Sequence, residues 1–525
     1  IKYDFLGLKT LRMFVRTIKL ILERHEGIQN PTNKQINDWY YTHITPSKIN
    51  PEDQKVLKNV FHDGKWPGIF QFVNDGAQQF VQDIKPKNVT DIAIATAIFR
   101  PGPLAAHVDK LYIKALNENS SKDYGHPKVN EVLSASRGFI VFQEQISKIA
   151  IELSDFTPAE GEKLRKAILK RTTKGALSAK TETEILQEKF IDGAVRNGYS
   201  KESAEQLYED MRAFAAYGFV RAHAVSYAYI SYQCAWLFTY YPSEWLCAYA
   251  ETMIGTPENR ARMMSELKAL GYSIAEVDIN NSGHDWTISD DGKTFYPSFA
   301  TVKGVGKIAV DEIIANRPYV EPTDIFWDQD RNWKTKKFNK RAISALIRTE
   351  SFGSMGIVGP DKTFKSYAHM HHVIVDNSDR LRSKTKRDPD RNLRALQELV
   401  AADIPAWTID ERIQNKKDLI GYFDVSILLN PELLEKLFRH NLIDIGHFTK
   451  NGIYWFVVHA IAEKTTKTGK SYLILSLFDA LGNTHKLTCW NASKDQVVLN
   501  KVCIAKITKD NWGFKTKIED IRVIE

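Results

Sequence analysis

The sequence predicts a multidomain, mainly α-helical protein that ends in a small five-stranded β-barrel. Long amphipathic stretches with few glycines run through residues 26–290, which is the pattern of helices. After Ile453 the pattern changes to five short β-segments joined by tight turns, as in the oligonucleotide-binding (OB) fold. The chain has 525 residues, which is enough for about three or four domains.

The composition is that of an ordinary soluble globular protein, with 43% hydrophobic and 26% charged residues. No run of about 18 apolar residues occurs, so no membrane span is predicted. The four cysteines lie far apart, which argues against a zinc ribbon or a disulfide framework and predicts a reducing, cytoplasmic location. The net charge of +8 permits nucleic-acid binding without requiring it.

The elements are expected in a definite order along the chain. A strand end and an amphipathic helix come first, the helix with apolar positions at Leu11, Phe14, Val15, Ile18 and Leu22. After the long helical stretch, the turn-rich segment 278–292 suggests a small β-hairpin, and two short helices are expected within 296–316. The basic run 378–395 predicts a linker or exposed loop, after which helix resumes. We therefore expect five segments, at residues 1–25, 26–290, 291–375, 376–450 and 451–525.

Asp4 stands between Tyr3 and Phe5, on an apolar segment that leads into the first predicted helix. A buried carboxylate needs a partner, because burying an unpaired charge is strongly unfavourable. A divalent metal ion is one such partner, and a helix N-terminus or a salt bridge is the alternative. From the residues alone, these roles for Asp4 stay open.

A basic cluster at 163–174 places four lysines on one face of a predicted helix, at Lys163, Lys166, Lys170 and Lys174. Like charges four residues apart destabilise a helix slightly, and a bound polyanion would reverse that penalty. A solvated helix face is the alternative. The pattern therefore indicates either a polyanion site or an exposed helix surface.

A second cluster follows a predicted tight turn at 217–219, on a helix that carries Arg221 and His223. A histidine between alanines is ordinarily structural, so a packing role and a binding role for His223 both stay open. Arg100 precedes a Pro-Gly-Pro turn and could either form a scaffold ion pair or contact a phosphate backbone.

Residues 299–314, F-A-T-V-K-G-V-G-K-I-A-V-D-E-I-I, resemble a helix-hairpin-helix. Gly304 and Gly306 would let the backbone approach a phosphate with its N–H groups, and Lys303 and Lys307 would add charge. This motif binds duplex backbone without reading sequence. A bare G-V-G turn also occurs without DNA binding.

The predicted barrel carries lysines in one hairpin and aromatic residues on neighbouring strands, a combination that predicts single-strand binding. The aromatic residues could instead belong to the core. The lysines are Lys464, Lys467 and Lys470, and the aromatics are Tyr472, Phe478 and Trp490. Three histidines could suggest a metal site, but no second ligand cluster supports it, and exposed loop residues are expected at His369, His371 and His372.

Several segments resemble, in order and at similar spacing, the motifs of C-family DNA polymerases, the family of the bacterial replicative polymerase III alpha subunit. The resemblance extends along most of the chain. The segments are K-Y-D-F-L-G-L (2–8), G-I-F-Q-F (68–72), I-F-R-P-G-P-L (98–104), V-F-Q-E-Q-I (141–146), L-R-K-A-I-L-K-R (164–171) and Y-G-F-V-R-A-H-A-V-S-Y-A (217–228).

The resemblance implies template-directed addition of deoxynucleoside triphosphates (dNTPs) to a primer 3′-hydroxyl, with Mg²⁺ as cofactor and primer-template DNA as partner. It implies that Asp4 ligates the metal and that Lys2 lies near the triphosphate, in a short piece of an α/β palm. The residues implied to grip nucleotide phosphates are Arg165, Lys166, Lys170, Arg171, Arg221 and His223. The residues expected to contact DNA are Arg100, Lys303, Gly304, Gly306, Lys307, Lys464, Lys467 and Lys470.

The sequence departs from the family at two of these places. Lys166 replaces an arginine, which keeps the charge and loses a bidentate fork, and Ile168-Leu169 replaces Met-Gly. Gln143, Glu144 and Gln145 are expected to form a structural hydrogen-bond network rather than to act in catalysis.

The family's paired palm aspartates (D-x-D), its thumb and its phosphoesterase-like domain would all lie before Ile1. The chain is therefore predicted to need an N-terminal polymerase half, in the same polypeptide or as a separate chain, and a bacteriophage gene would suit such a split. A sliding clamp stays an open partner, because Gln397-Glu398-Leu399-Val400 is a poor match to the family's clamp peptide and Leu475-Ser476-Leu477-Phe478 lies in a predicted strand. The alternative function is a non-catalytic DNA-binding accessory protein or a decayed polymerase fragment.

Overall fold

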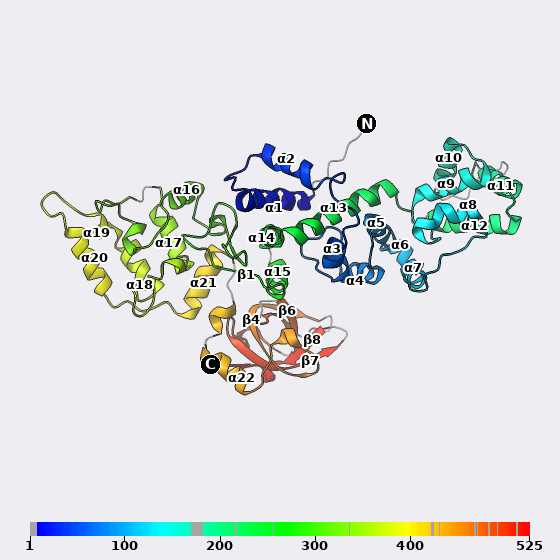
Figure 1. The fold of residues 1–525 in the computed structure, drawn as a ribbon. Helices are drawn as coiled ribbons and strands as arrows, with labels where there is room; N and C mark the ends of the chain where they lie inside the picture. The colour runs from blue at the N-terminus through cyan, green and yellow to red at the C-terminus, as the bar shows by residue number, and fades with distance from the viewer. Residues whose placement is uncertain are drawn as a thin grey trace. The chain divides into compact units, whose positions relative to one another are not determined.

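The chain forms two compact units, Ile1–Trp245 and Leu246–Glu525 (Figure 1). The computed structural model describes residues 8–169, 182–215, 218–255, 257–334, 337–421, 425–429, 431–466, 469, 471–480, 484–490, 492–510 and 513–524. None of the described helices is long and apolar enough to cross a membrane. Residues 1–7 of the predicted end of a palm (residues 1–25), with Lys2 and Asp4, lie outside the described residues.

The first unit is built from helices, with short loops between them. They are α1 (Lys9–His25), α2 (Asn33–His43), α3 (Gln54–Val56), the π-helix η1 (Leu57–His62), α4 (Asp75–Ile84), α5 (Val89–Ile98), α6 (Pro101–Ala105), α7 (Val108–Asn117), α8 (Pro127–Leu133), the 3₁₀-helix η2 (Ser134–Ser136), α9 (Gln143–Ser154), α10 (Pro158–Leu169), α11 (Glu182–Arg196), α12 (Lys201–Ala215) and α13 (Arg221–Tyr240). α14 (Pro242–Met253) begins in this unit.

The helix predicted near the N-terminus is α1, which buries Phe14, Ile18 and Leu22. Leu11 and Val15 belong to the same predicted stripe, yet they are 48% and 47% exposed, whereas Met13, Leu20 and Ile21 are buried, so the buried face of α1 is displaced around the helix from the predicted stripe. α13 packs against α3, η1 and α5 along its length. Its first turn reaches the bundle formed by α8–α12 (Figure 1).

The α8–α12 bundle has its own hydrophobic core, and Ile149, Leu164, Phe190 and Leu207 in it are fully buried. α9 and α11 approach each other closely at Gly193, where an added Cβ would clash with the backbone of Ser154. This close approach explains a glycine in the middle of a helix, where it costs about 1 kcal/mol relative to alanine. The bundle is therefore a well-packed platform for the side chains on α9 and α10.

The second unit begins with α15 (Pro257–Ala269) and a three-stranded sheet in the order β1-β3-β2, formed by β1 (Ser273–Ile274), β2 (Thr287–Ile288) and β3 (Thr294–Tyr296). The antiparallel pair β2–β3 confirms the predicted hairpin. The elements that follow are η3 (Phe299–Thr301), α16 (Lys307–Ala315), η4 (Pro322–Ile325), α17 (Lys340–Arg348), η5 (Gly353–Met355), α18 (Tyr367–His371), the π-helix η6 (His372–Asp376), α19 (Ser378–Arg382), α20 (Arg391–Ala401), α21 (Ile409–Leu419), η7 (Val425–Leu428), α22 (Pro431–Arg439) and η8 (Ile445–His447).

The basic run 378–395 differs from the linker or exposed loop that its charge predicts. It contains α19 and the start of α20, and Leu381 and Asn392 are 0% and 1% exposed. Leu381 joins the same core as the helix-hairpin-helix region. The charges stay at the surface, for example in the 2.6 Å ion pair between Arg380 and Glu398, because long basic side chains cover apolar surface while their heads reach water. The five-segment division of the chain remains a prediction.

The C-terminal strands close into the predicted OB-like barrel. The strands are β4 (Gly452–Thr465), β5 (Ser471–Phe478), β6 (Thr484–Trp490), β7 (Val502–Asp510) and β8 (Gly513–Lys517), with β9 (Arg522–Val523) added at β7 and the 3₁₀-helices η9 (Lys494–Gln496) and η10 (Ile518–Asp520) between strands. They pair in the order β4-β5-β6-β8-β7, and β4 also pairs with β7, which closes the barrel. Alternate residues of β5, namely Leu473, Leu475 and Leu477, are fully buried and fill the interior.

Candidate functional site

The start of α13 is held in place by α9. The backbone N–H of Gln143 donates to the carbonyl of Phe219 at 2.9 Å. Both carboxylate oxygens of Glu144 accept from the backbone N–H of Arg221, at 3.0 and 2.9 Å. A carboxylate at a helix N-terminus is stabilising, because it satisfies an unpaired N–H and complements the helix dipole. Arg221 and His223 therefore begin α13 in a defined position.

Arg165 on α10 is tied to the same place through Gln143. Its Nε and Nη2 donate to the two carboxylate oxygens of Glu162 at 2.8 and 2.5 Å, and its Nη1 donates to Oε1 of Gln143 at 2.5 Å. Gln143 in turn donates through Nε2 to the carbonyl of Gly218 at 2.6 Å. The Gln143 side chain thus bridges α10 and the residues just before α13, so two clusters far apart in the sequence meet.

These contacts fix the charge states around Arg165. The hydrogen bond from Arg165 lowers the pKa of Glu162 to about 2, and the bond to Glu162 raises the pKa of Arg165 above its usual value. Arginine has five N–H donors, and within the described part of the chain three of those of Arg165 are engaged. The remaining donors suit an anion, since arginine binds phosphate oxygens in a forked arrangement.

A row of aromatic contacts brings Arg100 and His223 to the same segment. The Arg100 guanidinium lies 4.1 Å from the centre of the Phe219 ring, and His223 makes an edge contact with that ring at 5.2 Å. His223 also lies 4.0 Å from the ring of Tyr227. Arg100, Arg221 and His223 are all exposed, whereas Arg165 has 18% of its side chain exposed. Arg100 makes a cation–π contact here, and its expected role in a scaffold ion pair or a phosphate contact stays a prediction.

The side chains of Arg100, Arg165, Arg221 and His223 therefore gather around residues 218–223, although they come from three different parts of the chain. Long-range contacts bring the three arginines there, through Phe219, Gln143 and Glu144. The charge of the arginines and the exposure of Arg100, Arg221 and His223 are what a polyanion such as a triphosphate requires. The expected structural network of Gln143, Glu144 and Gln145 is present, and Gln145 caps α9 by accepting from the N–H groups of Val141 and Phe142.

Sequence reasoning missed the role of Gln143 and Glu144 as connectors between the two cationic clusters. The only signal was their polarity in an otherwise apolar segment.

Lys163 and Lys166 are exposed on α10, and Lys166 forms a 3.4 Å ion pair with Glu162. Two of the predicted phosphate contacts, Lys170 and Arg171, lie outside the described residues.

The predicted metal ligand Asp4 and its neighbour Lys2 also lie outside the described residues. Among the residues that the structure describes, no group of three or more histidine, cysteine, aspartate or glutamate side chains could hold a metal ion. The metal site therefore stays a prediction.

The helix-hairpin-helix turn has the backbone that its sequence predicts. Gly304 has φ of +100°, which favours glycine, and Gly306 is the N-cap of α16. An added Cβ at Gly306 would meet nothing within 4 Å, so the backbone there is open to a ligand. Lys303 and Lys307 are exposed on either side, and the Lys303 N–H donates to the carbonyl of Leu419 at 2.8 Å. The turn can thus present N–H groups and charge to a phosphate.

In the barrel, the aromatic residues divide between surface and core. Tyr472 and Trp490 are paired across β5 and β6 with ring centres 4.8 Å apart, and Trp490 is 38% exposed. Lys464 is exposed and lies opposite Tyr472 on β4. Phe478 instead packs against the hydrophobic core and stacks on His459. Lys467 and Lys470 lie outside the described residues.

The three histidines expected on an exposed loop occupy helices instead. His369 in α18 is fully buried, and its Nδ1 accepts from the N–H of Lys365 at 3.1 Å. His371 contacts Ser344 at 2.9 Å, and burial lowers its pKa. The apolar pattern around them, at Met370 and Val373, was the signal for this burial. The weak clamp-peptide candidate in α20 has Leu399 buried in the same core.

Segments of this chain that form these sites match two known protein families. Residues 27–198 match the bacterial DNA polymerase III alpha subunit finger domain, and residues 271–359 match the helix-hairpin-helix motif family. The first match covers Arg100 and Arg165 but ends before Arg221 and His223, and the second covers Gly304 and Gly306.

Several curated relatives are named DNA polymerase III subunit alpha. The protein from Aquifex aeolicus is 34% identical over 67% of this chain and 28% of its own length. The Treponema pallidum protein is 28% identical over 92% of this chain and 40% of its own length, and a Staphylococcus aureus protein is 32% identical over 68% and 31%. The chain thus spans well under half the length of these relatives. We conclude that most of this chain is homologous to a part of the bacterial DNA polymerase III alpha subunit.

Proposed function

We propose that this chain is the C-terminal part of a DNA-directed DNA polymerase and that its finger helices grip the incoming dNTP. The observation that carries the proposal is the convergence of Arg100, Arg165, Arg221 and His223 around residues 218–223. The reaction adds a nucleotide to the primer 3′-hydroxyl and releases pyrophosphate. Electrostatic stabilisation of the triphosphate is the main task left to protein side chains in such a reaction.

Each residue of the cluster has a distinct task in this proposal. Arg165 uses its remaining N–H donors on the phosphate oxygens, while Gln143 and Glu162 hold its guanidinium in place. Arg221 adds charge and His223 adds a ring N–H donor from the first turn of α13. Arg100 either contacts the DNA backbone or supports Phe219. Lys166, Lys170 and Arg171 supply further charge for phosphates.

Mg²⁺, when bound, neutralises phosphate charge and activates the primer hydroxyl. Asp4 would contribute one ligand, with Lys2 near the triphosphate. A single carboxylate cannot hold two ions, so further carboxylates must come from a palm that contains D-x-D. The proposal therefore includes an N-terminal polymerase half as partner.

The second unit would hold the DNA. The Gly304–Gly306 turn, with Lys303 and Lys307, suits the duplex backbone, and Lys464, Lys467 and Lys470 with Tyr472 and Trp490 suit a single strand. A sliding clamp is a further proposed partner, without an identified peptide. The described cysteines are all free and buried, which suits the reducing cytoplasm of a bacterium or of a phage-infected host.

Primer extension tests the proposal. A primed template, dNTPs and Mg²⁺ are incubated with the chain alone and with the chain plus an N-terminal half that carries D-x-D. We expect synthesis in the mixture that depends on both chains. If the mixture stays inactive while the chain binds DNA tightly, the accessory-protein function replaces the polymerase function.

A further inference from the structure

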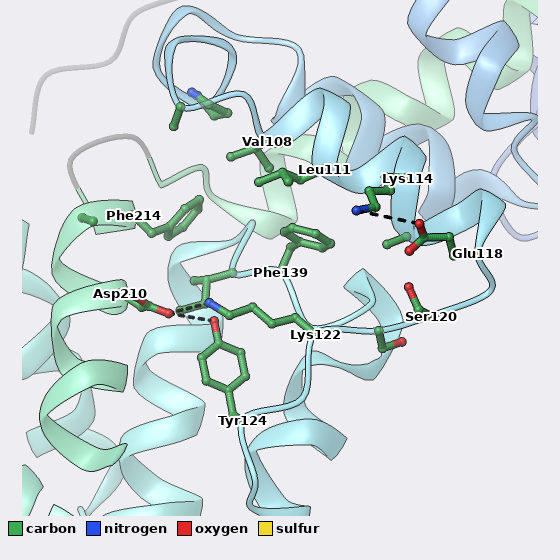
Figure 2. A pocket seen from close by; sticks show the side chains of 16 residues that line it. Val108, Leu111, Lys114, Glu118, Ser120, Lys122, Tyr124, Phe139, Asp210 and Phe214 are labelled. Carbon is green, nitrogen blue, oxygen red and sulfur yellow. Dashed lines mark hydrogen bonds and ion pairs between the residues drawn. The ribbon is translucent and has the colours of Figure 1, made fainter. Parts of the chain in front are cut away.

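A cavity of about 570 Å³ lies in the first unit between α7 and the end of α12. Figure 2 shows the side chains that form its walls, among them Val108, Leu111, Phe139 and Phe214. Pockets of this size hold small molecules. The residues that line the cavity do not include those of the candidate phosphate site, namely Arg100, Arg165, Arg221 and His223. The cavity is therefore a separate feature of the fingers.

The walls of the cavity are mainly apolar. Besides the labelled residues, they include Pro103, Ala106, Ala115, Ile140 and Ala213. Leu111, which lines the cavity, is 50% exposed. Apolar surface that faces water in a concave site is stabilised when a ligand covers it. The two phenylalanine rings favour a flat ring system as that ligand.

One polar group inside the cavity carries a positive charge in a fixed position. The Lys122 ammonium lies 2.6 Å from Oδ2 of Asp210 and 4.4 Å from the centre of the Tyr124 ring, as Figure 2 shows. Burial is the largest single influence on Lys122 and lowers its pKa, but the hydrogen bonds and charges of Asp210 and Tyr124 together outweigh burial and raise the pKa, so the ammonium stays charged. The Lys122 backbone is anchored as well, because its N–H donates to the carbonyl of Arg137 at 3.0 Å.

The carboxylates that line the cavity are already paired. Asp210 accepts from Lys122, from the Tyr124 hydroxyl at 3.3 Å and from Gln206 at 3.0 Å. Glu118 lies 3.8 Å from Lys114 at the other side. The Lys122 ammonium has three N–H donors, one of which is used by Asp210. An added carboxylate would therefore share the Lys122 ammonium with Asp210, which also accepts from the neutral donors Tyr124 and Gln206.

We propose that this cavity binds a small molecule with a flat apolar ring system and one carboxylate. The ring lies between Phe139 and Phe214, and the carboxylate accepts a hydrogen bond from Lys122. Such a charge-assisted bond is stronger than one to a neutral acceptor of the same shape. The site therefore distinguishes an acid from its amide.

Calorimetric titration of the full chain with 1-naphthoate and with neutral 1-naphthamide tests the proposal. We expect one saturable site for naphthoate, with affinity about fivefold or more above that for the amide. Ala213→Trp, at an exposed position of α12, fills the cavity and should abolish binding, whereas Glu202→Trp at the start of the same helix should leave it unchanged. Absence of a saturable site, or equal binding to both tryptophan variants, would overturn the proposal.

Lys122→Met gives a second and independent measurement, because it keeps the apolar stem and removes the charge. We expect this variant to lose the preference for the acid and to bind naphthoate no more tightly than naphthamide, because Asp210 then lacks its cationic partner. A preference for the acid that persists in Lys122→Met would place the carboxylate elsewhere and would contradict the proposed site.

Discussion

Replacing Gln143 by leucine should weaken nucleotide binding without unfolding the fingers. The Gln143 side chain donates to the carbonyl of Gly218 at 2.6 Å and accepts from Arg165 at 2.5 Å. Leucine has nearly the same volume and can make neither bond. Arg165 keeps its two hydrogen bonds to Glu162, but it loses the bond that holds its guanidinium near the start of α13.

The size of the effect follows from the two bonds that are lost. A hydrogen bond to a charged group contributes about 1.5–3 kcal/mol, and a neutral one about 0.5–1.5 kcal/mol. Gln143 is half-buried, so solvent replaces part of each bond, and we expect a loss of about 1.5–3 kcal/mol in nucleotide binding. Because every 1.4 kcal/mol is tenfold, the KM for dNTP should rise about 10- to 150-fold.

The assay is steady-state primer extension at varied dNTP concentration, with the thermal midpoint measured alongside. Gln79→Leu is the matched control, since Gln79 is an exposed glutamine of the same unit that bonds to Asp83 at 2.8 Å. We expect Gln79→Leu to leave the KM unchanged. If Gln143→Leu shifts the KM no more than Gln79→Leu does, while both proteins stay folded, the connecting role of Gln143 is refuted.

Three further predictions concern stability and DNA binding. Gly193→Ala should lower the free energy of unfolding by about 1–3 kcal/mol, because the added Cβ clashes with the backbone of Ser154. Gly255→Ala is the control and should leave the free energy of unfolding unchanged, because an added Cβ there meets nothing within 4 Å. Urea denaturation of both variants measures the difference. His371 has its pKa lowered by burial, so it binds fewer protons when folded than when unfolded. The free energy of unfolding should therefore fall as the pH drops from about 7 to about 5, and His371→Asn should flatten this slope, whereas an unchanged slope would contradict the burial. Trp490→Ala should weaken single-strand binding by about 1–3 kcal/mol, measured by fluorescence anisotropy, and leave duplex binding unchanged; an equal loss on both substrates would argue against stacking.

Local patterns in the sequence predicted the elements well. Alternation in the last 75 or so residues predicted the barrel, because alternate side chains of a strand point to opposite faces. The glycines at 304 and 306 predicted their turn, in which Gly304 has the positive φ that favours glycine and Gly306 caps α16. Both inferences depend on neighbours in the sequence, which is why they succeeded.

Contacts between residues far apart in the chain could not be predicted from the sequence. The meeting of Arg165 with the start of α13 depends on Gln143, which is 22 residues from Arg165 and 75 from Gly218. The burial of His369 and the packing of residues 378–395 depend on a shared core, and their charge and polarity argued for exposure. Polar residues near a core can be read either way until their partners are known.

The central claim is that Arg165, Arg221 and His223 grip the nucleotide rather than the DNA. Arg165→Ala tests it most directly, with Arg212→Ala as control, because Arg212 forms the same i,i+3 ion pair with Glu209 on a neighbouring helix of the bundle. The measurement is the KM for dNTP and the Kd for primer-template DNA of the reconstituted polymerase. We predict that Arg165→Ala raises the KM about tenfold or more and changes the Kd less than about twofold, while Arg212→Ala changes neither. A large change in the Kd with an unchanged KM would contradict the account and assign the cluster to DNA.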